Sequence, residues 1–289
     1  MRFIEKDFNN TNARNQLESL SYFCDVDNSV IAKKGNYSSS RYGHNIVRKE
    51  LEYLYLGKCC YCETKINPVS TAHVEHFRPK SKITGVNKNG YYWLGYEWSN
   101  LLLACPSCNG IKSTKFPLLR NNHIVDHPVD YNGNFDHLKL RNDQNYLNAE
   151  RPLLINPEYW KPEGLMYIDN LGKLVPIKNN RIAKTTIDEI ELNRDALIIA
   201  RQGKIDNIIT RIREQLVARH GEYPLDDDQY KYQLNLIFKI IASRINPNSE
   251  YTLLGRAMIE RFDELILEEI EPEFRDEIRN YFREYLINI

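Results

Sequence analysis

The segment CCYCETKINPVSTAHVEHFRPKS, residues 59–81, gathers several kinds of chemistry into one short stretch. It begins with three of the chain's six cysteines and continues into His73 and His76, with Glu75 between them. Because side chains alternate across a β-strand, His73 and Glu75 would share one face, and a bend at the strand's end would bring His76 toward the same centre. Two basic residues follow directly. The segment therefore predicts a strand with titratable side chains beside a group of thiols.

A second cysteine pair with the same C-x-x-C spacing follows the first after 42 intervening residues. Two such pairs can present four thiolates to one zinc ion, each sulfur about 2.3 Å from the metal. The four candidate ligands are Cys59, Cys62, Cys105 and Cys108. Four protein ligands leave no open coordination position, so this zinc would be structural.

Two other interpretations of these cysteines are open. The thiols could be reduced and buried, where they would pack as small apolar groups. Cys60 could also replace Cys59, but only in a strained C-x-C arrangement. Cys24 lies far from both pairs, and we expect it in the core.

Composition places the chain among soluble globular proteins. Its 289 residues include 39 basic and 39 acidic side chains, so the net charge indicates no partner. No N-terminal apolar segment and no apolar run of the ~20 residues that span a bilayer are present, so we expect a cytoplasmic protein with reduced cysteines. Residues 51–120 carry nine Lys and Arg against four Asp and Glu, whereas residues 251–289 carry five against ten. The basic excess lies on the cysteine-bearing segment, where a polyanion would bind.

The periodicity of apolar residues divides the chain. It predicts a helix over 41–57, short strands and turns over 58–120, and only short strands from 121 to about 180. Beyond Thr185 it predicts helices, which are expected at 186–219, 226–244 and 249–286.

Two asparagines frame the second cysteine pair. Asn100 precedes it, and Asn109 follows the last cysteine directly. A carboxylate and an asparagine oxygen are hard ligands that suit Mg²⁺ or Mn²⁺. A neutral histidine beside them can remove a proton from water near neutral pH. The segment from His73 to Asn109 therefore has the residue types of a metal-assisted hydrolase.

The order C-x-x-C, VEHFRPK and WSNLLLAC-x-x-CN-x-x-K resembles the HNH endonucleases and their ββα-metal motif. The additional pieces FPL and LLINPE, together with TI…LN…L…R, are similar to the retron-associated and Septu-type family of HNH nucleases (PtuB-like). These pieces cover most of residues 59–201. The resemblance implies an α+β fold with an HNH core and zinc knuckles, flanked by helices.

The resemblance also implies roles for individual residues. His76 would be the general base, and Glu75 with Asn109 would hold one Mg²⁺ or Mn²⁺ ion. Asn100 would orient His76 and brace the turn, while His73 has no settled role. The expected phosphate contacts are Arg78, Lys80, Lys82, Lys112 and Lys115.

We expect four parts in the chain. Residues 1–57 would be an N-terminal helical segment, 58–120 the zinc-stabilised nuclease core, 121–185 a β and loop extension, and 186–289 a helical C-terminal region. The expected activity is metal-dependent hydrolysis of nucleic acid, with DNA as the favoured substrate and RNA as the second. The resemblance further implies an ABC/SMC-like ATPase partner (PtuA-like) in prokaryotic antiphage defence. The alternative is a zinc-knuckle module that binds nucleic acid without catalysis.

Overall fold

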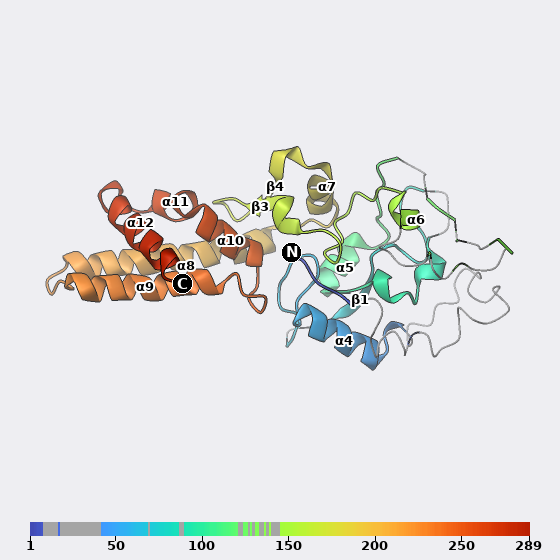
Figure 1. Ribbon diagram of the computed structural model, residues 1–289, viewed down its shortest axis with the longest axis horizontal. Helices are drawn as coiled ribbons and strands as arrows, with labels where there is room; N and C mark the ends of the chain where they lie inside the picture. Colours follow the sequence, from blue (N-terminus) through green and yellow to red (C-terminus); the bar gives the residue numbers. More distant parts are fainter. Residues whose placement is uncertain are drawn as a thin grey trace. The chain divides into compact units, whose positions relative to one another are not determined.

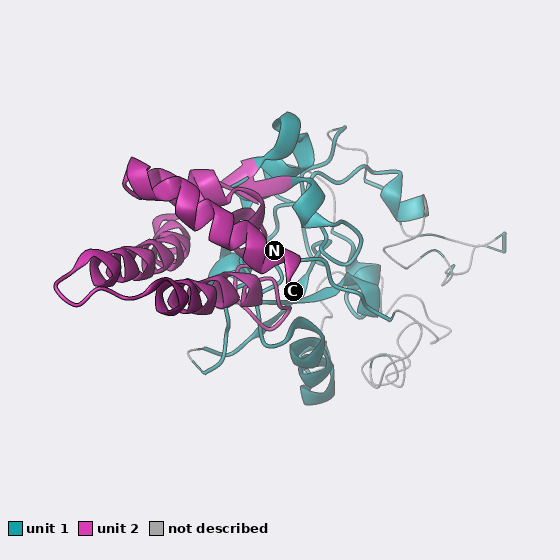
Figure 2. Ribbon diagram, turned by 60° about the vertical axis from the view of Figure 1, so that its left-hand side comes forward, with its two compact units in different colours: residues 1–165, 176–192 teal, residues 166–175, 193–289 magenta. Residues whose placement is uncertain are grey.

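The computed structural model describes residues 1–7, 17, 42–68, 70–86, 90–120, 124–126, 128, 131–132, 136, 139 and 145–289. The chain divides into two compact units (Figure 2). Unit 1 comprises Met1–Leu165 and Pro176–Leu192, and unit 2 comprises Met166–Val175 and Asn193–Ile289. The four-part division expected from the sequence is finer than this one and stays a prediction.

The centre of unit 1 is a two-stranded antiparallel sheet with one helix after it (Figure 1). Strand β1 (His73–His76) pairs antiparallel with β2 (Leu101–Ala104), in a register that sets His73 opposite Ala104. Every residue of β2 is buried, which is typical of a strand covered on both faces. Helix α5 (Pro106–Lys112) follows β2 directly.

Local sequence explains how these elements begin and end. The thiol of Cys105 caps α5 by accepting a hydrogen bond from the backbone N–H of Cys108, and Pro106 occupies the first turn, where its missing N–H costs nothing. Helix α4 (Asn45–Tyr55) begins at a His44 cap and ends at Leu56 in the left-handed conformation. It lies inside the helix predicted over 41–57 and packs on β2.

Short elements complete unit 1. The 3₁₀ turns η1 (Tyr92–Leu94) and η2 (Trp98–Asn100) precede β2. Later come α6 (Asn145–Asn148), η4 (Pro162–Gly164), η5 (Ile177–Asn179) and α7 (Arg181–Glu189). Of the short strands predicted after residue 121, the described residues show one hairpin, β3 (Met166–Ile168) with β4 (Leu174–Pro176), and all of it but Pro176 belongs to unit 2.

Unit 2 is helical, as predicted for the C-terminal region. Besides the β3–β4 hairpin, its elements are α8 (Asp195–His220), α9 (Asp227–Ser243), α10 (Thr252–Glu260), α11 (Phe262–Leu265), η6 (Leu267–Glu269) and α12 (Pro272–Ile287). Helix α9 packs against both α8 and α12 (Figure 1). The Phe262 and Phe282 rings stack in this core with centroids 3.9 Å apart.

Two helices predicted as continuous are broken, whereas the breaks predicted between 219 and 226 and between 244 and 249 are both confirmed. Asp226, the expected first residue of the second helix, caps α9 with a capping box. The segment 249–286 breaks after Glu260 and again before Pro272. The sequence predicted one helix because Ile266, Leu267 and Ile270 are buried in the turns and continue the apolar pattern. The segment 186–219 likewise contains the end of α7 and the start of α8. Among the described residues, no helix is long and apolar enough to cross a membrane.

Candidate active site and thiol cluster

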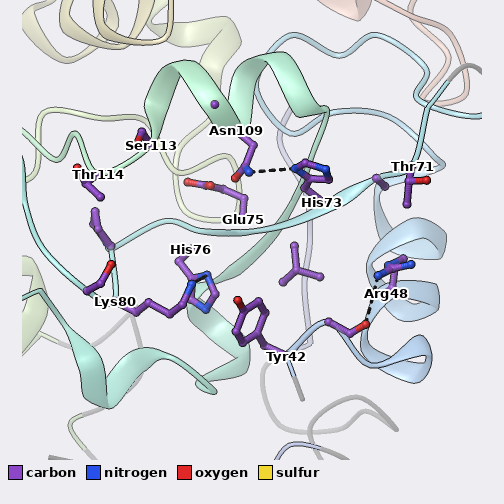
Figure 3. A pocket seen from close by; sticks show the side chains of 16 residues that line it. Tyr42, Arg48, Thr71, His73, Glu75, His76, Lys80, Asn109, Ser113 and Thr114 are labelled. Atoms are coloured by element: carbon purple, nitrogen blue, oxygen red, sulfur yellow. Dashed lines mark hydrogen bonds between the residues drawn. The ribbon is translucent and has the colours of Figure 1, made fainter. Parts of the chain in front are cut away.

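A cavity of about 680 Å³ opens beside β1 in unit 1. It is lined from three directions: by β1, by α5 and by the residues that lead into α4 (Figure 3). Glu75, His76 and Asn109 all line it, together with His73 and Lys80. The structure therefore brings the proposed base and both proposed metal ligands to one space.

Glu75 points from β1 toward α5 (Figure 3). Glu75 is 3 % exposed, and Lys112 Nζ lies 2.6 Å from the Glu75 Oε1 atom. The Tyr61 hydroxyl donates a second hydrogen bond of 3.2 Å to Oε1. Burial raises the pKa of Glu75, and the Lys112 ammonium acts in the opposite direction. The ion pair with Lys112 offsets the desolvation free energy of a carboxylate charge at this buried position.

His73 and Asn109 face each other at the rim of the cavity, on the same side as Glu75. Asn109 Nδ2 and His73 Nδ1 are 3.1 Å apart. Amide and imidazole meet here because His73 and Glu75 are two apart on the strand and α5 crosses that face. His73, which had no settled role, thus contacts one of the proposed metal ligands.

His76 is held on the other side of the strand. Its Nε2 lies 2.9 Å from the carbonyl oxygen of Gly95. A carbonyl only accepts, so Nε2 carries the proton and Nδ1 has a lone pair. Lys80 Nζ lies 3.4 Å from that Nδ1 atom. Burial, reinforced by the charge of Lys80, lowers the pKa of His76 to about 3, so its imidazole is neutral at neutral pH.

Tyr42 is a site residue that the sequence did not reveal. Its ring meets the His76 ring edge to face, with centroids 4.7 Å apart, and Lys80 Nζ lies 4.5 Å from the Tyr42 ring centroid. Such contacts fix ring orientation as well as burying area. Tyr42 is 34 positions before His76 in the chain, and no local spacing connects the two.

Asn100 lies at the end of η2 and is fully buried. Its Oδ1 accepts from the backbone N–H of Arg78 at 2.8 Å, and its Nδ2 donates to the carbonyls of Arg78 and Leu94 at 3.0 and 3.2 Å. These bonds brace the turn that follows His76. The part of its expected role that concerns orienting His76 stays a prediction.

Two of the five expected phosphate contacts are internal, which corrects the sequence interpretation. Arg78 is 1 % exposed and pairs with Glu150, with Nε 3.1 Å from Oε2. Lys112 is fully buried between Glu75 and the carbonyl of His76. A buried guanidinium or ammonium already satisfied by a carboxylate is a structural group, and it has no room for a phosphate.

The other three basic residues reach solvent to different degrees. Lys82 is exposed, and Lys80 is half-buried at the cavity. Lys115 is half-buried and donates to the carbonyl of Glu189 at 2.9 Å. These three remain the candidates for phosphate contact.

Replacement of Arg78 is therefore expected to act on folding. Arg78→Met should lower the free energy of unfolding by about 3–5 kcal/mol, because Glu150 would keep a buried charge without its partner. Urea unfolding measures this. Arg78→Met/Glu150→Gln should recover part of the loss, and Lys82→Met should be near neutral. An unchanged stability in the single variant would refute the structural role of Arg78.

The four predicted zinc ligands come together. The Sγ atoms of Cys59, Cys62, Cys105 and Cys108 all lie within 4.8 Å of one another. Cys62 and Cys105 sulfurs are 3.9 Å apart, close to the ~3.8 Å edge of a tetrahedron with metal–sulfur distances of about 2.3 Å. Neighbouring thiols that donate to its sulfur, Cys105 first, lower the pKa of Cys62. The cluster fits a structural zinc ion.

Cys60 is separate from this cluster, although it is adjacent in sequence to Cys59. Its residue is buried, and its backbone N–H donates to the carbonyl of Leu103 at 2.7 Å. That bond ties the first thiol pair to β2, and the Cys105 cap ties the second pair to α5. Cys24 lies outside the described residues.

Comparison with known proteins agrees with this geometry. Residues 59–115 match the family model of the HNH endonucleases. The Septu protein PtuB of Bacillus mycoides (strain KBAB4) is 34% identical over 110 residues, which is 36% of this chain and 37% of that protein. The Septu protein PtuB of Bacillus thuringiensis is 34% identical over 98 residues, 32% of this chain and 34% of that protein. The chain thus matches about a third of the length of these two relatives.

A third relative matches more of the chain. The "Retron Vc95 putative HNH endonuclease" of Vibrio cholerae serotype O1 biovar El Tor is 27% identical over 175 residues, covering 61% of this chain and 71% of that protein. No solved structure matches the chain significantly. Residues 59–115 therefore match an HNH endonuclease domain, and the chain is similar, over part of its length, to HNH proteins of Septu and retron systems.

Proposed function

We propose that the chain is a metal-dependent HNH endonuclease that hydrolyses phosphodiester bonds of nucleic acid. The observation that carries this proposal is the shared cavity of His76, Glu75 and Asn109. A module that only bound nucleic acid would have no need to line one cavity with a neutral imidazole, a carboxylate and an amide.

The proposed general base is His76. Its Nε2–H bond to the Gly95 carbonyl fixes the tautomer, so Nδ1 is the atom that takes a proton from the attacking water. Tyr42 holds the ring from the side. Lys80, next to Nδ1, has its pKa lowered, chiefly by burial, and a phosphate oxygen entering the cavity would offer it an anionic partner.

The proposed ligands of a catalytic Mg²⁺ or Mn²⁺ are the Glu75 carboxylate and the Asn109 side-chain oxygen. Both are hard oxygen donors, and in the structure it is the amide nitrogen of Asn109 that faces His73. When bound, the ion would act as a Lewis acid on the phosphate and stabilise the departing oxygen. Lys112 holds one Glu75 oxygen and so limits how that carboxylate can turn.

The proposed zinc has no part in the chemistry. Its four sulfurs lie where the first cysteine pair meets the start of α5. Strand β2 follows Asn100 directly, and α5 contains Asn109. A metal at that junction would fix the strand against the helix in a unit with few regular elements.

Changes at the two proposed metal ligands are expected to alter the metal requirement of cleavage. Asn109→Ala should raise the Mg²⁺ concentration for half-maximal rate by about tenfold or more, because one ligand is lost. Asn109→Asp should keep that requirement near wild type or lower it, since a carboxylate replaces an amide oxygen. Glu75→Gln should behave as Asn109→Ala, with partial rescue by Mn²⁺.

Metal-titrated initial rates on a plasmid substrate measure these effects. The informative comparison is between the two Asn109 variants, because Asn109→Ala should raise the Mg²⁺ requirement and Asn109→Asp should not. Identical metal dependence in all four proteins would remove Glu75 and Asn109 from the metal site.

We further propose that the nuclease is the effector of a prokaryotic antiphage system and acts with an ABC/SMC-like ATPase. The support is the Septu and retron origin of the relatives. Unit 2 offers an acidic surface that is unsuited to phosphate, with Glu268, Glu269 and Glu271 exposed. Charge reversal at Glu268 and Glu271 should weaken co-purification with a PtuA-like ATPase and leave cleavage by the isolated chain intact. Unaltered co-purification would remove this surface from the interface.

A further inference from the structure

Unit 1 contains a second cavity, of about 550 Å³, that shares no lining residue with the candidate active site. Its walls come from the residues after β1, the segment 148–160 and the start of α7. Half of the lining residues are apolar: Phe77, Leu119, Pro152, Leu153, Trp160 and Ile182. A concave space of this size, with apolar walls and a few polar groups, is the usual form of a small-ligand site. Nothing in the proposed hydrolysis uses it.

Trp160 offers an aromatic face there. Its residue is 41% exposed, whereas Trp93 and Trp98 are 3% and 4% exposed and belong to the core. The turn beneath it is fixed, because the Trp160 backbone N–H donates to the Asn156 carbonyl at 3.0 Å. An accessible indole on a fixed turn is a suitable platform for a planar ring.

Asn156 supplies a hydrogen-bond donor that is not used within the described part of the chain. Its residue is 1% exposed and lines the cavity. The Oδ1 atom accepts from the backbone N–H of Glu158 at 2.9 Å, which sets the orientation of the amide. The Nδ2 atom is buried and has no hydrogen-bond partner among the described residues. A buried donor of this kind favours a ligand with an acceptor atom.

Two arginines give the cavity a positive rim. Arg151 and Arg181 both line it and are both exposed. No carboxylate of the described residues forms a salt bridge with either of them, in contrast to Arg78, which lines the same cavity and pairs with Glu150. Two uncompensated guanidinium groups beside an apolar cavity select an anionic group, and planar donors suit phosphate best.

We propose that this second cavity binds a nucleotide. The base would lie against Trp160 and accept a hydrogen bond from Asn156 Nδ2, and the phosphate would lie between Arg151 and Arg181. Every nucleobase has a suitable acceptor, and the Oδ1 atom of Asn156 is already occupied. A single hydrogen-bond donor cannot discriminate one nucleobase from another, so binding is expected to show little base preference. The nucleotide is either a free mononucleotide or an unpaired nucleotide of a strand.

Titration of Trp fluorescence tests the proposal, since the other two tryptophans are buried. The protein is the full chain carrying His76→Ala, so that no substrate is consumed and the result does not depend on nuclease activity. The probes are AMP, CMP, adenosine and a short single-stranded DNA. Saturable quenching is expected, with adenosine at least about tenfold weaker than AMP because it lacks the phosphate.

Variants identify the cavity as the site. Arg181→Gln and Arg151→Gln should each weaken nucleotide binding about tenfold, measured by calorimetry. Trp160→Phe should remove the fluorescence change while weak binding persists. Lys184→Gln is the matched control, because it makes the same charge change on the same helix outside the cavity. Thermal unfolding of each variant confirms that it is folded.

The outcomes separate the two sources of the nucleotide. Binding of AMP and CMP that depends on Arg181 supports a free mononucleotide. Binding of the DNA alone, again dependent on Arg181, supports a nucleotide within a strand. No binding of any probe up to about 1 mM, or binding to which Arg151, Arg181 and Lys184 contribute equally, would overturn the proposal.

Discussion

His76→Ala is expected to lower the rate of metal-dependent nucleic-acid cleavage by about 10²–10⁴-fold, the usual contribution of a positioned general base. The imidazole is neutral, its tautomer is fixed by the Gly95 carbonyl, and it lines the same cavity as Glu75. Initial cleavage rates at saturating Mg²⁺ measure the effect. Zinc content should stay at the wild-type level, because His76 is not one of the four clustered ligands.

Two further variants sharpen this result. Tyr42→Ala should lower the rate by a smaller factor, since it removes the ring that contacts His76 and leaves the base in place. His220→Ala, an exposed histidine of unit 2, should cleave as the wild type does. Near wild-type cleavage by folded His76→Ala would show that another group activates the water.

Cys59→Ser is expected to lose the zinc ion and unfold unit 1, whereas Cys60→Ser should retain both zinc and fold. The two thiols are neighbours in sequence and both are buried, but only Cys59 belongs to the four-sulfur cluster. Apparent zinc-binding energies of about 10–16 kcal/mol in zinc-finger peptides indicate how much stability one such ion can supply.

Metal analysis of protein purified without added zinc measures this pair, together with far-UV circular dichroism. Wild type and Cys60→Ser should each contain about one zinc per chain. Full zinc content in Cys59→Ser, or its loss in Cys60→Ser, would mean that the ligands are different from those proposed.

Local features of this fold could be predicted from sequence because their causes are local. The repeated C-x-x-C spacing identified the four sulfurs that the structure brings together. The alternation in His73–His76 predicted β1. Within each cysteine pair and within the strand, the residues are only a few positions apart, so their spacing in sequence determines local geometry; the repeat of one spacing is what linked the two distant pairs.

Features that depend on distant partners could not be predicted. A basic residue looks the same in sequence whether it faces solvent or pairs with a buried carboxylate, and Arg78 pairs with Glu150, which is 72 positions away. Tyr42 reaches His76 only through the tertiary fold. The second cavity joins residues from 77 to 182, so no motif could indicate it.

The measurement that tests the central claim most directly is cleavage of plasmid DNA and of single-stranded RNA by the purified chain, with and without Mg²⁺. Wild type and His76→Ala are compared, each alone and with a PtuA-like ATPase. We predict strand cleavage of at least one nucleic acid that requires the divalent ion and is lost in His76→Ala. Binding of nucleic acid without metal-dependent cleavage under every one of these conditions would contradict the account and identify the chain as a zinc-knuckle binding module.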